Sequence, residues 1–533
     1  MSEDMELPNK WAIVKLGEIA TYINGKAFKP SEWSKEGLPI IRIQNLNRKK
    51  SEFNYCNFSV DDKYYVNKGD LLFAWSGTPD TSFGAHIWSG KRAVLNQHIF
   101  RIVINENKIT KQYYLYALNH KVKEFVSKAH GTAGLAHITK KKFEESEIAL
   151  PPLPEQHCTV AKIEELFSEL DNGIENLKKA REQLKTYRQA VLKYAFEGKL
   201  TKEWRNLQRR AGNPPEPAEK LLKQIRTERE KHYQRQLEDW KKACEQAKAD
   251  GKKKPVKPKK PKELPPLTGK ELAELPELSV GWVWAKLGCV VRKIFDGPFG
   301  SNLKTQDYVE KGVRVIRLEN IGVLDFINEK KSYISKEKYN LIKKHKVFSG
   351  DIIFSSFISE EIRVIILPSY IKKAINKADC FCIRVAKSSL CNKYLAFYLS
   401  TKSTYNHLIH QVHGATRPRI NTTQLRNCCI PLCSNHEQQQ IVREIESRLS
   451  VCDKLEQTIE DSLKKAEALR QSILKKAFAG ELTKYWREKH PELITGENSA
   501  EKLLEKIKAE KARAIESGKK PRSKKMKSKK SQN

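Results

Sequence analysis

The chain repeats one long stretch of its own sequence, and this repeat limits what it can fold into. "AFEGKLTKEWR" begins at Ala195, and "AFAGELTKYWR" begins at Ala477, 282 residues later. The same shift places Glu155–Arg205 on Glu437–Arg487 without a gap, with 19 identical residues in 51. Two copies with so long a period do not make a solenoid, because solenoid repeats are roughly 20–45 residues long. The repeat predicts two domains of one type, each followed by the same kind of connector.

Shorter anchors extend the repeat into the rest of each copy, although gaps are needed to align them. They are "KLGEI" at Lys15 with "KLGCV" at Lys286, "GLPIIRIQNL" at Gly37 with "GVRVIRLENI" at Gly312, "KGDLLF" at Lys68 with "SGDIIF" at Ser349, and "HGTAGLAHIT" at His130 with "HGATRPRIN" at His413. Their apolar runs are short, rich in strand-forming residues and bounded by turns, whereas the segments that begin at Thr110 and Cys391 have helical spacing. We therefore expect two α+β domains of the same fold.

The two connectors have the pattern of long helices. Apolar residues alternate at steps of three and four along both copies, in the series Val160, Ile163, Phe167, Leu170, Ile174, Leu177 and Leu184, and in the series Val442, Ile445, Leu449, Cys452, Ile459, Leu463 and Ala466. A seam held for about four heptads is typical of a coiled coil. We predict that the connectors pair as an antiparallel coiled coil that separates the domains and sets their spacing. The alternative is that each helix lies on its own domain.

The repeated stretch also predicts how each long helix ends. Gly198 and Gly480 suit the left-handed residue that follows a helix. Thr201 and Thr483 are placed to cap the next helical turn. At the opposite ends, Glu155 and its repeat equivalent Glu437 would favour the helix dipole.

Because a duplicated surface implies a duplicated partner, residues of this stretch are also candidates for subunit docking. The candidates are Phe196, Gly198, Trp204, Phe478, Gly480 and Trp486. The alternative is a helix terminus that is buried against its own chain.

The charge of the chain limits the kinds of partner. There are 100 Lys and Arg against 64 Asp and Glu, which gives a formal charge of +36, and such a charge calls for a polyanion. No apolar run approaches the roughly 18 residues of a spanning helix, and the polar, acidic start is not a signal peptide. Eleven scattered cysteines without a C-x-x-C motif indicate reduced thiols in the cytoplasm. DNA and RNA remain as candidate partners.

The order of these motifs resembles the specificity (S) subunit of type I restriction-modification systems. The resemblance is carried by "FDGPFGSNLK" from Phe295, "GVRVIRLENIG" from Gly312, "GATRPRIN" from Gly414, "IPLCSNHEQQQIV" from Ile430 and "LPPLPEQHCTVAKIEEL" from Leu150. It covers nearly the whole chain except the basic linker and tail. The first domain has "INGKAFKP" where "DGPFGS" would be expected.

The resemblance implies a bacterial or archaeal DNA-recognition subunit without catalytic residues of its own. It would bind an asymmetric bipartite site on duplex DNA, with one half-site for each domain. It would gather two modification subunits, which methylate adenine with S-adenosylmethionine, and restriction and translocase subunits, which use ATP. No cofactor and no metal is implied for the chain itself; S-adenosylmethionine, ATP and magnesium belong to the partner subunits.

Base reading requires forked donors, such as Arg on guanine and Asn or Gln on adenine. The matched anchors supply candidates for DNA contact, which are Arg42, Gln44, Asn45, Lys140, Lys141, Asn302, Lys304, Arg317, Asn320, Arg417, Arg419 and Asn421. Residues shared by two different readers could instead be framework or phosphate contacts. In that case the divergent segments carry the sequence code.

The repeat suggests six segments. They are residues 1–150 as the first recognition domain, 151–205 as the first helical connector, 206–265 as a basic Lys/Pro-rich linker with a helix, 266–430 as the second recognition domain, 431–489 as the second connector, and 490–533 as a helix with a basic tail. Lys252–Lys262 holds seven lysines in eleven residues, and we expect such runs to lack fixed structure.

Two enzymatic alternatives need separate tests. "NPPEP" at Asn213 begins like an adenine methyltransferase motif, but Glu216 stands where an aromatic residue would stack on a flipped base. "PD" at Pro79 and "ENK" at Glu106 imitate the two carboxylates and lysine of a nuclease. An RNA-binding architectural protein is a third possibility.

Overall fold

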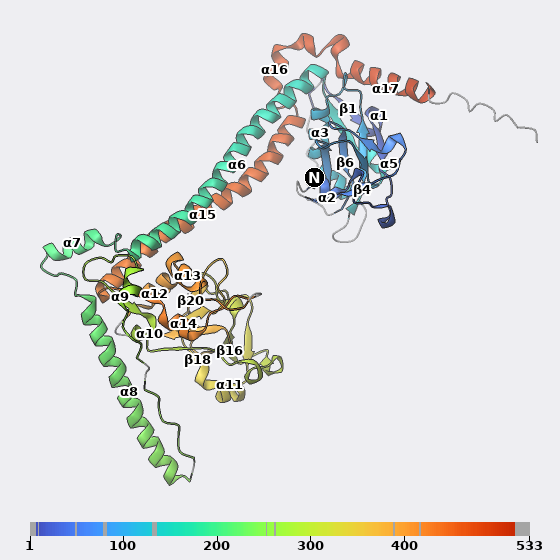
Figure 1. Ribbon diagram of the computed structural model, residues 1–533. Coiled ribbons are helices and arrows are strands. Elements are labelled where there is room, and N and C mark those ends of the chain that lie inside the picture. The colour runs from blue at the N-terminus through green and yellow to red at the C-terminus, as the bar shows by residue number, and fades with distance from the viewer. Residues whose placement is uncertain are drawn as a thin grey trace, which may run out of the picture. The chain divides into compact units, whose positions relative to one another are not determined.

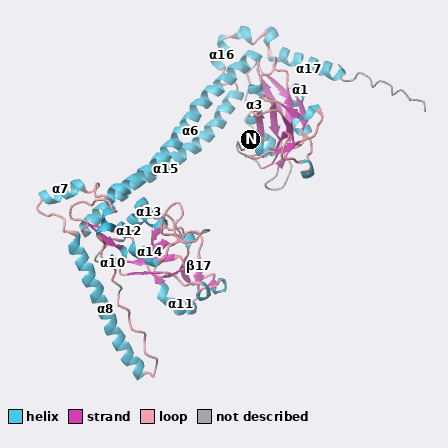
Figure 2. Ribbon diagram, viewed as in Figure 1, coloured by secondary structure: helices cyan, strands magenta, loops and turns pink. Residues whose placement is uncertain are grey.

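The computed structural model describes residues 7–8, 10–47, 51–77, 83–129, 136–251, 253–260, 263–386, 390–414 and 417–517. The chain divides into two compact units (Figure 1). The first is built from both ends of the sequence, and the second from its middle. The first unit holds residues 1–178 and 460–533, and the second unit holds residues 179–459. Both units mix strands and helices, as Figure 2 shows.

The first unit contains two four-stranded sheets. One sheet is antiparallel and has the order β2 (Thr21–Asn24), β10 (Ile99–Val103), β6 (Leu71–Ala74) and β8 (Gly84–Ile87). The other has the order β4 (Asn54–Cys56), β3 (Leu38–Ile41), β9 (Ala93–Leu95) and β5 (Tyr65–Val66), and its β3–β9 pair is parallel. Two short pairs complete the domain: β1 (Ala12–Lys15) with β12 (Glu147–Leu150), and β7 (Ser76–Gly77) with β11 (Ala136–His137).

The second unit repeats this topology, with one more strand in its second sheet and an isolated Phe357–Arg419 bridge in place of the β7–β11 pair. Its antiparallel sheet has the order β14 (Lys293–Phe295), β22 (Cys380–Arg384), β19 (Ile352–Ser355) and β20 (Val364–Ile366). Its second sheet has the order β15 (Tyr308–Val309), β17 (Ser332–Ile334), β16 (Val313–Ile316), β21 (Ala374–Asn376) and β18 (Lys346–Val347), again with one parallel pair, β16–β21. β13 (Val283–Lys286) pairs with β23 (Cys429–Leu432). The prediction of two α+β domains of one fold is confirmed.

Helices follow the same correspondence. The first unit has α1 (Leu16–Ile19), α2 (Ile43–Asn47), α3 (Lys111–His120), α4 (Val122–Lys128) and α5 (Lys140–Glu144). The second has α9 (Gly269–Ala273), α10 (Leu287–Val290), α11 (Lys336–Ile342), α12 (Asn392–Leu399), α13 (Lys402–Ile409) and α14 (Thr422–Asn427). The helices predicted from Thr110 and Cys391 are therefore present as α3–α4 and α12–α13.

The repeated "KGDLLF" and "SGDIIF" anchors form a turn that starts the central strand of each antiparallel sheet. The Asp70 carboxylate accepts the backbone N–H of Asn67 at 2.8 Å, and the Asp351 carboxylate accepts that of Phe348 at 2.9 Å. The apolar residues that follow are fully buried in both copies. This anchor is therefore framework, which explains why both domains share it.

Two helices of 44 residues, α6 (Leu153–Phe196) and α15 (Asn435–Phe478), supply the connectors. Within the first unit Arg470 of α15 pairs with Asp171 of α6, and its guanidinium lies 4.5 Å from the Phe167 ring centre. Within the second unit Arg188 of α6 pairs with Asp453 of α15 at 2.6 Å. The two ion pairs are repeat equivalents with their donors exchanged, so the helices run antiparallel in each unit, as predicted.

Further helices follow each long helix. They are α7 (Lys202–Arg210) and α8 (Ala218–Ala249) after α6, and α16 (Lys484–Lys489) and α17 (Ala500–Ser517) after α15. Leu221 and Ile225 of α8 are buried in the core of the second domain, and Leu503 and Ile507 of α17 are buried in that of the first. Among the described residues, no helix is both long and apolar enough to cross a membrane.

Candidate nucleic-acid interface and helix junctions

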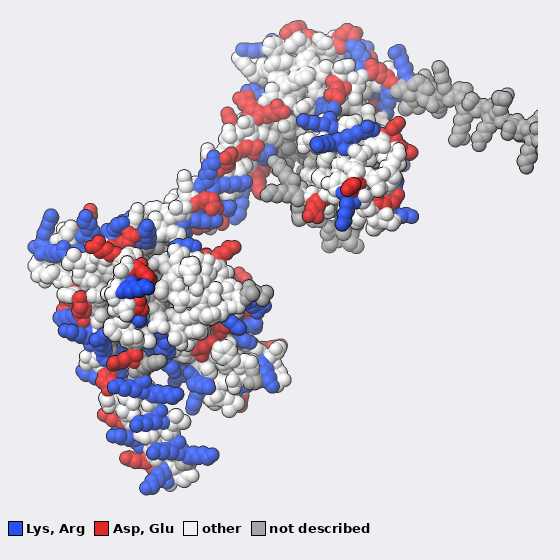
Figure 3. Space-filling view, in the orientation of Figure 1, with Lys and Arg blue, Asp and Glu red and all other residues white. Residues whose placement is uncertain are grey.

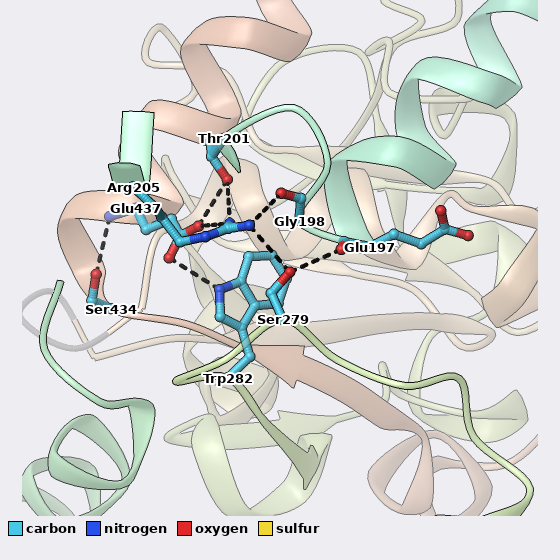
Figure 4. Close-up of polar contacts among 8 residues, drawn as sticks. All are labelled: Glu197, Gly198, Thr201, Arg205, Ser279, Trp282, Ser434 and Glu437. Carbon is cyan, nitrogen blue, oxygen red and sulfur yellow. Dashed lines mark hydrogen bonds and ion pairs between the residues drawn. The ribbon is translucent and has the colours of Figure 1, made fainter. Parts of the chain in front are cut away.

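The repeated stretch builds a buried polar junction in the second unit (Figure 4). The Arg205 guanidinium pairs with the Glu437 carboxylate at 2.5 Å and donates to the backbone oxygen of Gly198 at 2.8 Å. The Thr201 hydroxyl donates to the same carboxylate at 2.7 Å, and the Trp282 indole N–H donates to its other oxygen at 3.0 Å. Glu437 is buried, but each of its oxygens has a donor.

The first unit contains the same junction with its parts exchanged between the copies. Arg487 pairs with Glu155 at 2.9 Å and donates to the backbone oxygen of Gly480 at 2.6 Å. The Thr483 hydroxyl donates to Glu155 at 2.7 Å. Trp11 stands where Trp282 stands, since the guanidinium lies 5.8 Å from its ring centre against 5.9 Å in the second unit. The Thr and Arg of each "TK-x-WR" stretch therefore bind the Glu of the "EQ" in the other copy.

This geometry tests three predictions made from the sequence. Gly198 and Gly480 have φ of +72° and +74°, so the left-handed position is confirmed. The predicted capping by Thr201 and Thr483 is wrong: neither side chain caps the helix that follows, because each hydroxyl is used by a carboxylate.

The helix-dipole interpretation of Glu155 and Glu437 also misses their main contacts, since both carboxylates are buried against Thr and Arg of the other copy. The glutamine that follows each of these glutamates binds the backbone elsewhere in its own unit. Gln156 accepts the backbone N–H of Thr110, and Gln438 accepts that of Cys391. Each therefore fixes the residue that precedes α3 or α12.

The aromatic residues proposed for docking are only partly accessible. Phe196 packs edge-on against Tyr394 and Tyr398, with ring centres 5.1 and 5.0 Å apart. Phe478 packs against Tyr113 and stacks on His120 at 5.1 Å. Trp204 and Trp486 are half-buried. Phe196 and Phe478 thus anchor helix ends in their own units, and docking by the remaining surface stays a prediction.

In both domains the same backbone hydrogen bonds join the end of the central strand, β6 or β19, to two loops. In the first domain the Trp75 N–H donates to the His98 carbonyl at 3.3 Å, and the Ile138 N–H donates to the Trp75 carbonyl at 3.3 Å. In the second domain the corresponding bonds run from Ser356 to Asp379 at 2.9 Å and from Ile420 to Ser356 at 3.0 Å. This matching agrees with the sequence anchors, since Trp75 and Ser356 each stand two residues after the paired "KGDLLF" and "SGDIIF" anchors.

The side chains at these matched positions differ completely. In the first domain Trp75 lies against His98, with ring centres 5.5 Å apart, and His137 accepts or donates a hydrogen bond at 2.6 Å to Ser76. Burial, with the nearby His137, lowers the pKa of His98 below its usual value. We call Trp75, His98 and His137 the first loop cluster.

The second loop cluster is Ser356, Asp379 and Arg419. The Ser356 hydroxyl donates to the Asp379 carboxylate at 2.9 Å, and the Arg419 guanidinium lies 3.7 Å from the same carboxylate. Arg419 remains 56% exposed, so its donors can reach a ligand. A guanidinium with a carboxylate thus replaces the indole and imidazole rings of the first loop cluster.

Two of the predicted DNA contacts, Asn45 and Asn320, make hydrogen bonds within the framework. The Asn45 side chain accepts the Arg42 N–H at 3.0 Å, and the Asn320 side chain accepts the Arg317 N–H at 3.0 Å. The Asn320 amide also donates to Ile327 and Lys330 and is buried. Both asparagines close the turn after the strand, so "RIQN" and "RLEN" are turns rather than strand ends aimed at a base.

The remaining predicted contacts lie at the surface to different degrees. Arg42 and Arg317 lie over aromatic rings, those of Trp33 and Tyr308. Lys140 donates to the Tyr22 carbonyl at 2.8 Å, and Asn421 caps α14 through two backbone N–H groups. Lys140 and Asn421 are exposed, as are Gln44, Lys141, Asn302, Lys304 and Arg417.

The glycine of the "DGPFGS" motif has an equivalent in the first domain after all. A Cβ on Gly297 would lie 2.1 Å from the backbone of Lys377, and one on Gly25 would lie 2.1 Å from that of Asn96. Both glycines allow close approach to the segment that follows the parallel strand. Burial raises the pKa of the adjacent Asp296 to about 6.

The nuclease pattern does not assemble in the described residues. Lys108 pairs with Glu510 and donates to the Lys506 carbonyl at 3.2 Å, and Glu106 pairs with Lys111 at 2.8 Å. Pro79 and Asp80 lie outside the described residues. In the part of the chain that the structure covers, no three His, Cys, Asp or Glu side chains gather as a metal site.

Comparison with known proteins agrees with this architecture. A family model described as type I restriction modification DNA specificity domain matches residues 8–186 and 304–465. The type I restriction enzyme EcoBI specificity subunit of Escherichia coli is 28% identical over 530 residues, covering 98% of this chain and 96% of that protein. The MjaVIII specificity subunit of Methanocaldococcus jannaschii is 24% identical over 475 residues, covering 86% and 92%.

A solved chain from work on "complex assembly and conformational transition of the type I R-M system" aligns with a TM-score of 0.58 at 16% identity. The alignment covers 89% of this chain and 99% of that one. At this level of identity the likeness concerns the fold.

Proposed function

Since the chain belongs to the type I restriction modification DNA specificity domain family, and its relatives are non-catalytic specificity subunits, we propose that it reads an asymmetric, bipartite site on duplex DNA. Each domain reads one half-site. The formal charge of +36 supports a polyanionic ligand. Work in the cytoplasm fits the eleven free cysteines.

The observation that carries this proposal is the contrast between the two loop clusters. Both domains hold the same positions with the same backbone hydrogen bonds, yet one presents indole and imidazole rings and the other a guanidinium beside a carboxylate. A donor fork such as Arg419 suits the acceptors of guanine, whereas imidazole and indole groups offer single donors and flat apolar faces. Domains that differ in this way read different bases, which makes the whole site asymmetric.

The junctions support a scaffolding role. Each long helix is closed at its end by groups from the other copy, which gives the paired helices fixed termini. A 44-residue helix is about 66 Å long at about 1.5 Å per residue, which is close to two turns of duplex DNA at about 34 Å each. We propose that this pair sets the spacing of the half-sites.

The partners follow from the family. Two modification subunits fit a chain whose surface is duplicated, and restriction and translocase subunits complete the complex. We propose that S-adenosylmethionine, ATP and magnesium are bound by those subunits, and that this chain needs no cofactor to recognise DNA.

The test is to map methylated adenines in cells that carry the chain and its partner subunits. Arg419→Gln should change or relax only the second half-site, because a lost bidentate contact costs about 1–3 kcal/mol of discrimination. His137→Arg should change only the first half-site. Lys393→Gln is the matched control, because it also removes one charge in the second unit but breaks only an exposed ion pair with Glu446. Changes in both half-sites, or in neither, would contradict the proposal.

A further inference from the structure

A cavity lies between α8 and the second domain, away from the loop cluster of that domain. Its volume is about 870 Å³. The residues that line it come from α8, the segment that follows it, β14, β22 and α14; they are Arg229, His232, Gln236, Pro258, Lys259, Leu264, Gly288, Val291, Arg292, Lys293, Arg384, Thr423 and Arg426. We call it the α8 pocket. None of its lining residues is Asp or Glu.

The first turns of α8 are placed by the repeat. Arg229 donates to the carbonyls of Gly288 and Cys289 at 3.1 and 2.7 Å, at the end of α10. Lys511 of α17, its equivalent 282 residues later, donates to the carbonyl of Ala20 at 2.9 Å, at the end of α1. α8 then continues for 32 residues in all, against 18 for α17. The repeat thus docks α8: Arg229 and His232 line the pocket from the part of α8 that corresponds to α17, and Gln236 lies just beyond that part.

The lysine run after α8 contributes Pro258 and Lys259 to the pocket lining. The Trp240 indole donates to the Pro255 carbonyl at 2.8 Å, and Lys254 and Lys257 lie over the same ring. The prediction that this run lacks fixed structure is therefore wrong for these residues, because an aromatic side chain on α8 holds them. Lysine and arginine gather along this projecting arm in Figure 3. The basic tail at 518–533 lies outside the described residues.

The positive charge of the α8 pocket is largely uncompensated. Arg384 pairs with Asp351. The other lining cations have neutral acceptors or none in the described part of the chain: Arg229 and Arg426 donate to backbone carbonyls, and Arg292 contacts the His232 ring at 2.6 Å. Lys259 and Lys293 make no ion pair with a described carboxylate.

Burial and mutual repulsion oppose these charges in the unliganded protein. Burial lowers the pKa of Lys293, and the guanidinium groups of Arg384, Arg292 and Arg426 lower it further. Burial, followed by Arg292, lowers the pKa of His232. Cations that repel one another in a partly dry cavity are stabilised by an anion among them.

We infer that the α8 pocket binds backbone phosphates of duplex DNA next to the half-site that the second domain reads. Asn421 starts α14 next to Arg419, and Arg426 on the same helix lines the pocket. Five residues of helix span about 7.5 Å, which is close to two base steps at about 3.4 Å each. The pocket is therefore within reach of the same duplex. This inference rests on the proposed function, and it adds a sequence-independent contact that the first unit does not share within its described residues.

The experiment compares two double variants of the full chain, assembled with its modification subunits. Arg292→Gln with Lys293→Gln removes two charges from the pocket. Lys241→Gln with Lys242→Gln removes two exposed charges from the same α8 arm, outside the pocket. Affinity for a duplex with the methylated site, and for an unrelated duplex, is measured between 50 and 200 mM salt.

The pocket variant should lower the slope of log affinity against log salt by about 2, since each phosphate contact contributes about 0.9. Between 50 and 200 mM salt, its affinity should fall by a factor about tenfold smaller than the factor for the wild type. This difference should be the same on both duplexes. The arm variant should keep the wild-type slope. An unchanged slope, an equal effect of both variants, or an effect on the methylated site alone would overturn the inference. If the pocket variant misfolds, Lys259→Gln, which changes an exposed residue, should lower the slope by about 1.

These outcomes separate the inference from the proposed function. If Arg419→Gln alters the methylated sequence while the pocket variants bind like the wild type, only the pocket assignment fails. If Arg419→Gln leaves the methylated sequence unchanged, the proposed function fails whatever the slopes show.

Discussion

Between the two copies of the repeat, the loop clusters and the helix junctions differ in opposite ways. At the loop clusters the two domains keep their backbone hydrogen bonds and exchange every side chain, Trp75 for Ser356 and His98 for Asp379. At the junctions the two units keep the side chains themselves, with the same Thr, Arg and Glu in each. The comparison teaches that the repeat preserves the side chains that hold each unit together and varies those that we propose contact DNA.

The two junctions still differ in one bond. The Trp282 indole donates to Glu437, but the Trp11 indole and the second oxygen of Glu155 are buried and have no hydrogen-bond partner among the described residues. An unpaired buried polar group costs about 1–3 kcal/mol. The junction of the first unit is therefore the weaker of the two.

The largest expected effect comes from removing an arginine at a junction. Arg205→Ala leaves the Glu437 charge buried without its cation, and such a loss costs about 3–5 kcal/mol. We expect chemical denaturation to show this loss, and hydrogen exchange to place it in the second unit. Arg487→Ala should have the corresponding effect in the first unit.

A double variant checks the cause. Glu437→Gln in the Arg205→Ala background should recover part of the loss, because a neutral amide does not need a cation. A loss below about 1 kcal/mol for Arg205→Ala would mean that the pair is not the main support of this junction.

The tryptophans give the next largest effect and the sharpest contrast. Trp282→Phe leaves one Glu437 oxygen without its donor, which should cost about 1–3 kcal/mol beyond the change in packing. Trp11→Phe removes an indole N–H that has no described partner, so it should cost much less. Thermal unfolding of the two variants measures the difference, and equal losses would show that the junctions are alike.

The smallest effect is a pH dependence confined to the first unit. Burial, followed by Lys121, lowers the pKa of His120 to about 4 beside Phe478. The unfolded chain binds this proton below about pH 6.5 and the folded chain only below about pH 4, so stability is complete above pH 6.5 and falls by about 1 kcal/mol per pH unit on acidification between these values.

The readout is the difference between wild type and His120→Gln, measured by denaturation at pH 7 and at pH 5.5. The wild type should lose more stability than the variant. In the second unit Phe196 meets Tyr394 and Tyr398 instead, so exchange in that unit should show no such difference. A variant that keeps the full pH dependence would show that another group titrates.

Much of the fold could be predicted because the repeat and the periodicity report on local structure. The antiparallel helices, the two α+β domains and the left-handed Gly198 and Gly480 all followed from patterns within one copy. The function of Thr201 and Glu437 did not, because their partners lie more than 200 residues away. A helix cap and a helix dipole are the nearest explanations when only neighbours in sequence are visible.

The candidate interface was predicted less well for a physical reason. Aligning two copies highlights what they share, and shared residues such as Asn45 and Asn320 turn out to close backbone turns. The positions that differ, such as Trp75 and Ser356, can be aligned from the anchors beside them, but an alignment does not single them out. The hydrogen bonds of their backbones show which loop residues lie beside them in each domain.

The division of the first unit between both ends of the chain has a consequence for its synthesis. The second unit is continuous and can be completed once residue 459 has been made, but the first needs residues from 460 onward as well as those up to 178. At roughly 5–20 residues per second, the ribosome takes on the order of 15–60 s to make residues 179–459. During that interval Phe478 and α17 do not yet cover the apolar surface of the first domain. We therefore expect a chaperone to bind this surface.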